Sequence, residues 1–87
     1  MTHPPITLYV SDWCPYCQLA KQLLTQKNLV FAEIDVDGDA ELRREMTARS
    51  GRDTVPQIFI GDKHVGGCDD LVALDESGGL DRLIQGA

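Results

Sequence analysis

The chain has little positive charge, few cysteines and no long hydrophobic run, and each shortage argues against a class of protein. Its 87 residues include 8 lysines and arginines against 14 acidic residues, for a net charge of −6. That balance argues against a sequence-independent nucleic-acid binder, which needs a basic surface, and against docking on anionic membranes. Three cysteines are too few, and odd in number, for the disulfide framework of a small secreted domain.

Length and hydropathy indicate one small cytoplasmic domain. No apolar stretch approaches the roughly 20 residues that a transmembrane helix needs. The start of the chain, Met1–Pro5, lacks the basic segment and apolar run of a signal peptide. Hydrophobic residues make up 43% and charged residues 25% of the chain, as in an ordinary globular domain. We therefore expect a single domain over residues 1–87, in which Cys14, Cys17 and Cys68 need an explanation.

Hydrophobic periodicity and turn residues predict an α/β chain with the order β-α-β-α-β-β-α-α. Strands are expected over residues 6–10, 29–36, 55–60 and 63–65, and helices over residues 15–27, 40–50 and 80–84. A further helix should be capped by Asp69 and end before Gly78. The first two strands should be parallel because a helix joins them, and the last two should form a hairpin through Gly61–Asp62.

The segment Cys14-Pro15-Tyr16-Cys17 follows a predicted strand and opens a predicted helix, which is the usual setting of a redox pair. Thiol exchange needs a thiolate, and a free thiol with its usual pKa of about 8.5 is only slightly ionised at neutral pH. The positive end of a helix dipole stabilises that anion. We therefore predict that Cys14 is the nucleophile and that Cys17, one turn on and on the apolar face, is the resolving thiol.

Two packed core cysteines or half of a zinc site are the alternatives for this pair. Packing does not explain a cysteine in the connector before a helix. A structural zinc site takes four ligands, and only Cys68, His64 and His3 are available to complete one. The spacing therefore favours redox chemistry over a metal centre.

Three motifs together resemble the glutaredoxin family. They are Cys14-Pro-Tyr-Cys17, Thr54-Val55-Pro56 and Gly66-Gly-Cys-Asp-Asp70, and they stand in the family's order and spacing. The likeness runs from about Ile6 to Ile84 and is strongest to the small bacterial glutaredoxin 3 class, which also carries a cysteine at the position of Cys68. It implies a thioredoxin-like fold, with a four-stranded mixed sheet flanked by helices.

The resemblance implies glutathione as a co-substrate, no tightly bound cofactor and no metal. The implied glutathione-binding residues are Tyr16, Arg43, Thr54, Val55, Pro56, Gly67, Cys68, Asp69 and Asp70. A cis Pro56, carried over from the family, would leave the Val55 backbone free to pair with an extended peptide. The helix end at Gly67–Asp70 suits a carboxylate, and an aspartate there suits the ammonium group of the γ-glutamyl end.

One position departs from the family pattern. A lysine often stands three residues before the nucleophile, and Ser11 takes its place here. The resemblance points to Arg43 as the substitute cation for the glycyl carboxylate, ahead of Arg44 and Arg49, although each also fits a solvated surface charge.

Three further residues near the motifs keep more than one interpretation. Trp13 fits a rim contact for substrates or simple packing. Tyr16 fits a ligand contact or an exposed helix residue. Cys68 fits a small buried residue or a site of regulatory oxidation.

These features predict a glutathione-dependent thiol–disulfide oxidoreductase that acts as a monomer in electron transport and cell redox homeostasis. Its partners would be glutathione, disulfide-containing or glutathionylated proteins and, indirectly, glutathione reductase. The alternatives are a redoxin reduced by thioredoxin reductase, an iron–sulfur carrier that shares a cluster between two protomers, and a zinc-binding module. Pro15, next to the first cysteine, disfavours the iron–sulfur carrier by family analogy.

Overall fold

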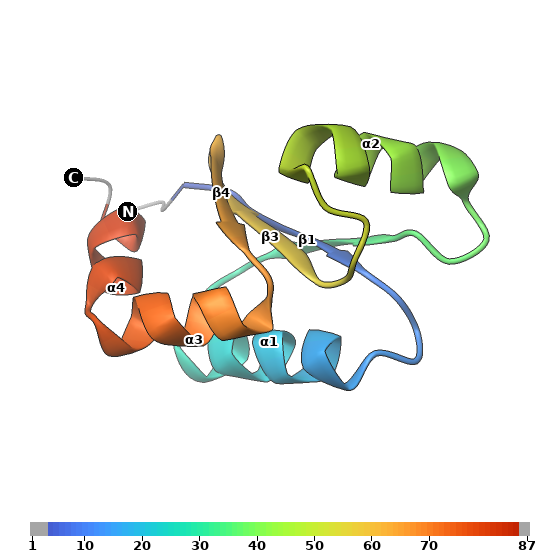
Figure 1. Cartoon of the computed structure of the whole chain (residues 1–87). Helices are drawn as coiled ribbons and strands as arrows, with labels where there is room; N and C mark the ends of the chain where they lie inside the picture. Colours follow the sequence, from blue (N-terminus) through green and yellow to red (C-terminus); the bar gives the residue numbers. More distant parts are fainter. Residues whose placement is uncertain (1–3, 86–87) are drawn as a thin grey trace.

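The computed structural model describes residues 4–85 and has the predicted order of elements (Figure 1). The strands are β1 (Ile6–Val10), β2 (Ala32–Asp35), β3 (Gln57–Ile60) and β4 (Lys63–Gly66). The helices are α1 (Pro15–Gln26), α2 (Ala40–Ser50), α3 (Cys68–Glu76) and α4 (Gly79–Ile84). Within these residues, no helix has the length and apolar character needed to cross a membrane.

The four strands form one mixed sheet in the order β2-β1-β3-β4. Strand β1 pairs in parallel with β2 and antiparallel with β3, and β3 and β4 form an antiparallel hairpin. Both predicted pairings are therefore confirmed. Helix α2 covers one face of the sheet, and α1 and α3 cover the other (Figure 1).

Alternation along the strands divides the core between the two faces of the sheet. The larger cluster contains Leu8, Ile58 and the buried residues of α1 and α3, among them Cys17 and Leu71. The smaller cluster, beneath α2, contains Tyr9, Val36, Met46 and Phe59. Because successive strand residues point to opposite faces, the residues that flank the cysteine pair and those that support the sheet from α2 belong to different layers.

Two strands are shorter than predicted. Strand β2 begins at Ala32, because Leu29 and Phe31 pack against the larger cluster before the ladder with β1 starts. Strand β3 begins at Gln57 instead of Val55. Pro56 has no N–H to give to a ladder, so the segment before Gln57 remains a loop.

The start of α3 also differs from the prediction. Its N-cap is Gly67, so Asp69 lies inside the helix and does not cap it. Asp70 supplies the capping interaction instead, because its carboxylate accepts a hydrogen bond from the Gly67 N–H at 2.9 Å. A side chain three positions into a helix can reach back to the N-cap in this way, as in a capping box.

Candidate active site

Cys14 lies at the N-terminus of α1, as the sequence predicts. It is the N-cap residue, and Pro15 follows it in the first turn. Its Sγ accepts a hydrogen bond from the Cys17 N–H at 3.1 Å, and its thiol donates to the Val55 carbonyl oxygen at 3.7 Å. The sulfur therefore sits between the N-terminus of α1 and the loop before β3.

Cys17 lies one turn further along α1 and is completely buried. Burial raises the pKa of its thiol to about 12, and the hydrogen bond with Cys14 acts in the same direction. All three cysteines are free thiols. Cys17 therefore keeps its proton at neutral pH, which suits a group that reacts second.

Burial raises the pKa of both Cys17 and Cys68. We therefore predict that a brief treatment with iodoacetamide at about pH 8 alkylates Cys14 before the other two cysteines. A thiol with a pKa of about 12 is ionised to only about one part in ten thousand at that pH, and alkylation requires the thiolate. Peptide mass spectrometry at short times should find the first adduct on Cys14. Cys14→Ser is the control, and it should remove that adduct. A first adduct on Cys17 in the wild-type protein would contradict the assignment.

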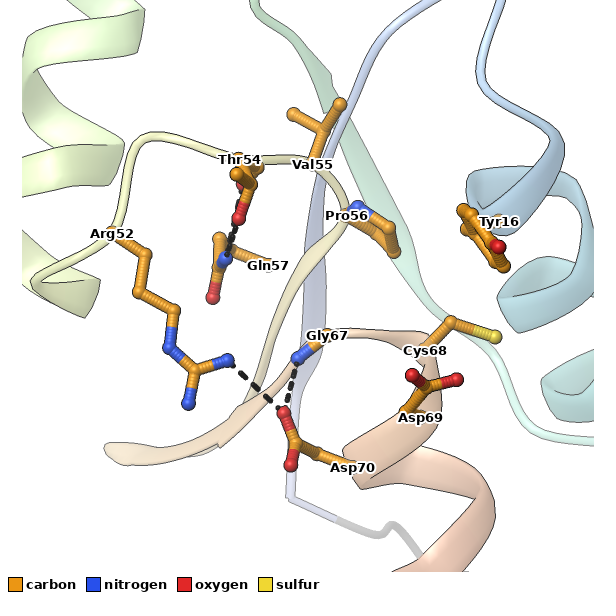
Figure 2. Close-up of a pocket in the computed structure, with 10 residues that line it drawn as sticks. All are labelled: Tyr16, Arg52, Thr54, Val55, Pro56, Gln57, Gly67, Cys68, Asp69 and Asp70. Carbon is orange, nitrogen blue, oxygen red and sulfur yellow. Dashed lines mark hydrogen bonds and ion pairs between the residues drawn. The ribbon is translucent and has the colours of Figure 1, made fainter.

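A groove opens beside the cysteine pair, between the start of α1, the loop before β3 and the start of α3 (Figure 2). Its lining residues are Tyr16, Arg52, Thr54, Val55, Pro56, Gln57, Gly67, Cys68, Asp69 and Asp70. Eight of the nine residues predicted to bind glutathione therefore come together here. The Val55–Pro56 peptide bond is cis, as the family resemblance implied.

The ninth predicted residue, Arg43, is not among the residues that line this groove. Its Nη2 donates to the Asp53 carbonyl oxygen at 3.0 Å, and the side chain lines a separate hollow on α2 together with Arg44. Arg49 does not line the groove either, and its Nη1 donates a hydrogen bond to the Tyr9 hydroxyl at 2.7 Å. None of the three arginines of α2 is therefore among the residues that line this groove.

Arg52 is a cation of this groove that the sequence analysis did not name. It lines the groove, and its Nη1 lies 3.1 Å from Asp70 Oδ2 (Figure 2). Its place two residues before Thr54, on the same loop as the proline motif, was the available signal. The family resemblance pointed to Arg43 on α2 instead.

The two aspartates at the start of α3 have different surroundings. Asp70 accepts from the Gly67 N–H and from Arg52, and these two interactions lower the pKa of its carboxyl. The exposed carboxylate of Asp69 makes no hydrogen bond or ion pair within residues 4–85. Gly66 is required beside them, because its φ is +123° and an added Cβ would collide with the Asp70 carboxylate. Asp70 therefore holds the helix end in place, and Asp69 remains available to a ligand.

Cys68 and Trp13 differ sharply in exposure. Cys68 is buried at the floor of the groove, and burial raises the pKa of its thiol, with the charge of Asp69 adding to the effect. Trp13 is 94% exposed, so the packing interpretation is wrong and a position at the rim remains. Tyr16 is 58% exposed and lines the groove with part of its surface.

Ser11 is held by the loop that follows β2. Its hydroxyl donates to Asp37 Oδ1 at 2.7 Å, and the Asp12 N–H donates to Asp37 Oδ2 at 2.8 Å. These two bonds lower the pKa of Asp37, that from Asp12 being the stronger, whereas repulsion from Asp35 raises the pKa of Asp12. Ser11 therefore positions the connector before Cys14 and supplies no cation to the groove.

The histidines considered for a zinc site do not adjoin the cysteine pair where they can be located. His64 Nε2 lies 2.7 Å from Gln57 Oε1, and its ring stacks on Phe59 beneath α2. Cys17 belongs to the cluster on the opposite face of the sheet. His3 lies outside the described residues.

Comparisons with known proteins agree with this geometry. A model of the glutaredoxin family matches residues 6–65. Glutaredoxin 3 of Escherichia coli K12 is 55% identical over 80 residues, which cover 92% of this chain and 96% of that protein. The solution structure of a glutaredoxin from Brucella melitensis has a TM-score of 0.85 at 51% identity and covers 100% of this chain and 96% of its own. The crystal structure of a buckwheat glutaredoxin–glutathione complex has a TM-score of 0.85 at 28% identity, with 94% and 77% covered.

Proposed function

The chain belongs to the glutaredoxin family and is a thiol–disulfide oxidoreductase, and we propose that glutathione is its reductant and that Cys14 is its nucleophile. The observation that carries the proposal is the position of the Cys14 sulfur. It stands at a helix N-terminus and faces the Val55 carbonyl, at one side of a groove with charged groups at its ends. A peptide disulfide bound in that groove would present its sulfur to Cys14.

The groove suits the three parts of glutathione. The Val55 backbone suits the cysteinyl part, because it lies outside the strand ladder and its N–H and C=O can pair with an extended peptide as an added strand does. The C=O accepts from the Cys14 thiol, and loss of that proton makes it available to the peptide. The N–H groups at the start of α3 suit the γ-glutamyl carboxylate, and the unpaired Asp69 carboxylate suits the ammonium group beside it. Arg52 suits the glycyl carboxylate, because a guanidinium pairs well with a planar anion. The buckwheat relative was crystallised with glutathione, which is consistent with this choice of ligand.

With a glutathionylated protein, the Cys14 thiolate attacks the glutathione sulfur and the protein thiolate leaves. One disulfide bond is formed and one is broken, so Cys14 now carries glutathione. A second glutathione, as its thiolate, attacks that sulfur, releases oxidised glutathione and restores the Cys14 thiolate. Cys17 takes no part in this cycle.

With a protein disulfide, Cys14 first forms a mixed disulfide with one substrate sulfur and releases the other as a thiolate. Cys17 then loses its proton and attacks Cys14, which frees the reduced substrate and leaves a Cys14–Cys17 disulfide. Two molecules of glutathione reduce that disulfide. Glutaredoxins have potentials of about −200 to −230 mV, above the about −270 mV of thioredoxin, so the glutathione pool can carry out this last step.

Coupled turnover tests the proposed reductant. With a glutathionylated cysteine peptide as substrate, we expect steady NADPH consumption when glutathione and glutathione reductase are supplied. Replacing both with thioredoxin reductase should lower the rate at least about tenfold, because the groove offers charged groups at both ends of a short peptide. Equal or faster turnover with thioredoxin reductase would instead assign the protein to the thioredoxin system.

A further inference from the structure

Gln57, the first residue of β3, is a buried polar side chain with every hydrogen-bonding group engaged. It is 1% exposed. Its amide nitrogen donates to the Thr54 carbonyl at 3.0 Å and to the Thr54 hydroxyl at 3.2 Å, and its amide oxygen lies 2.7 Å from His64 Nε2. Burying an amide is costly unless these bonds are made, so the side chain has one stable orientation.

The strand register explains why His64 reaches Gln57. The β3–β4 ladder shifts between Ile58 and Phe59, so that Phe59 pairs with His64 and Ile58 pairs with Gly66. Residues paired across a ladder share a face of the sheet, and the His64 ring stacks on Phe59 with centroids 4.9 Å apart. Gln57 lies two residues before Phe59 and so shares its face of the sheet, where the imidazole reaches the Gln57 amide oxygen.

The protonation of His64 follows from these contacts. Burial lowers its pKa and nearby Arg52 acts in the same direction, whereas Asp70 opposes them, so the ring is neutral at neutral pH. Both N–H bonds of the Gln57 amide point to Thr54, so its oxygen faces the imidazole. The single ring hydrogen therefore sits on Nε2, and His64 donates to Gln57.

The chain of contacts ends at the groove. Thr54 immediately precedes Val55, whose carbonyl accepts the Cys14 thiol at 3.7 Å, and this part of the loop lies outside the ladder (Figure 2). Arg43 holds the carbonyl of Asp53 earlier in the same loop. Gln57 therefore provides the brace nearest to the peptide unit that faces the reacting sulfur.

We propose that Gln57, oriented by His64, is a positioning residue that holds the Thr54–Val55 backbone where it can pair with the glutathione part of a mixed disulfide. The inference rests on the proposed function for the identity of the ligand. It adds the hydrogen bonds of Gln57 that shape the binding site. The brace acts from the α2 face of the sheet, opposite the layer that contains Cys17. It should therefore affect recognition of glutathione more than the intrinsic reactivity of Cys14.

Single-turnover kinetics with the reduced protein test this inference. The fluorescence of Trp13, next to Cys14, reports the reaction with a glutathionylated peptide and, separately, with hydroxyethyl disulfide, which has no peptide to pair with Val55. Gln57→Leu should lower the second-order rate constant about tenfold for the glutathionylated peptide, because two hydrogen bonds to the loop are lost. The rate constant for hydroxyethyl disulfide should stay within about twofold.

Two more variants separate positioning from loss of stability. Met46→Ala opens a cavity in the same buried layer, against which Val55 packs, but it removes none of the hydrogen bonds between Gln57 and the loop. It should therefore lower the melting temperature and leave the ratio of the two rate constants unchanged. His64→Leu keeps the bonds between Gln57 and Thr54 but removes their orientation, and should lower the ratio about threefold. If Gln57→Leu does not fold, the ratio measured for His64→Leu tests the positioning role instead.

The outcomes are distinct. A wild-type preference for the glutathionylated peptide that survives in both Gln57→Leu and His64→Leu overturns the positioning role and leaves the proposed function intact. The same loss of preference in Met46→Ala also overturns it, since stability alone would then explain the effect. A wild-type protein that shows no preference at all refutes glutathione as the ligand, and the inference fails with it.

Discussion

Cys14→Ser should abolish turnover of both glutathionylated peptides and protein disulfides, whereas Cys17→Ser should keep the first activity and lose the second. A serine hydroxyl is not ionised at neutral pH, so the first replacement removes the nucleophile and should reduce the rate at least about 1,000-fold. Cys17 is buried and protonated, with a pKa of about 12, and is needed only when a protein remains attached to Cys14. Coupled assays with the two substrates measure both activities.

The pair of variants is its own control, since both replace a cysteine of the same helix by the same residue. Cys68→Ser adds a third comparison. Cys68 forms no disulfide in either cycle, so both activities should persist, and any change should appear in the KM for the glutathionylated peptide because Cys68 lines the groove. Loss of deglutathionylation in Cys17→Ser, with its helix content unchanged, would reverse the assigned roles or make both thiols necessary in one step.

Arg52→Ala and Asp69→Ala should each raise the KM for a glutathionylated peptide about tenfold, equivalent to about 1.4 kcal/mol, with a smaller change in kcat. The two side chains line opposite parts of the groove and carry opposite charges, as the two ends of glutathione require. The effect should weaken at high salt because both groups are accessible to solvent. Steady-state kinetics at two ionic strengths measure it.

Arg43→Ala is the matched control, because it removes the same charge from a residue that lines a different hollow. Arg52→Lys tests whether charge alone suffices, and it also keeps a cation beside Asp70. A larger rise in KM for Arg43→Ala than for Arg52→Ala would restore the original assignment of the carboxylate-binding cation to α2.

Local sequence patterns were sufficient to locate most elements and one end of the site. Helix α1 begins where Pro15 predicts, and α2 spans the predicted residues 40–50. These features depend on periodicity and on residues that act within one turn. The errors arose where a ladder decides a boundary, as at Ala32 and Gln57, because strand pairing depends on the position of another strand and not on propensity.

The arginines of α2 and of the loop after it also show that a sequence pattern cannot decide a tertiary contact. Arg43, Arg44, Arg49 and Arg52 are indistinguishable by charge and lie within ten positions of one another. Only the path of the loop after α2 brings Arg52 over the groove and directs the Arg43 side chain to the Asp53 carbonyl. A side chain's role among several of one type is set by which backbone it can reach, and that is a tertiary property.

The sequence by itself determined that this small, acidic chain with three cysteines places a cysteine pair at the start of a helix. That conclusion needs only Cys14, Pro15 and Cys17, which are neighbours in the chain. The tertiary structure alone decided what faces the sulfur, since the Val55 carbonyl lies 41 positions away. It also decided that the Gln57 amide is hydrogen-bonded to Thr54 of that loop and to His64 of the next strand, because His64 pairs with Phe59 across the ladder. Contacts of this kind depend on the register of the sheet and the path of the loop, and local hydrophobic patterns do not specify either.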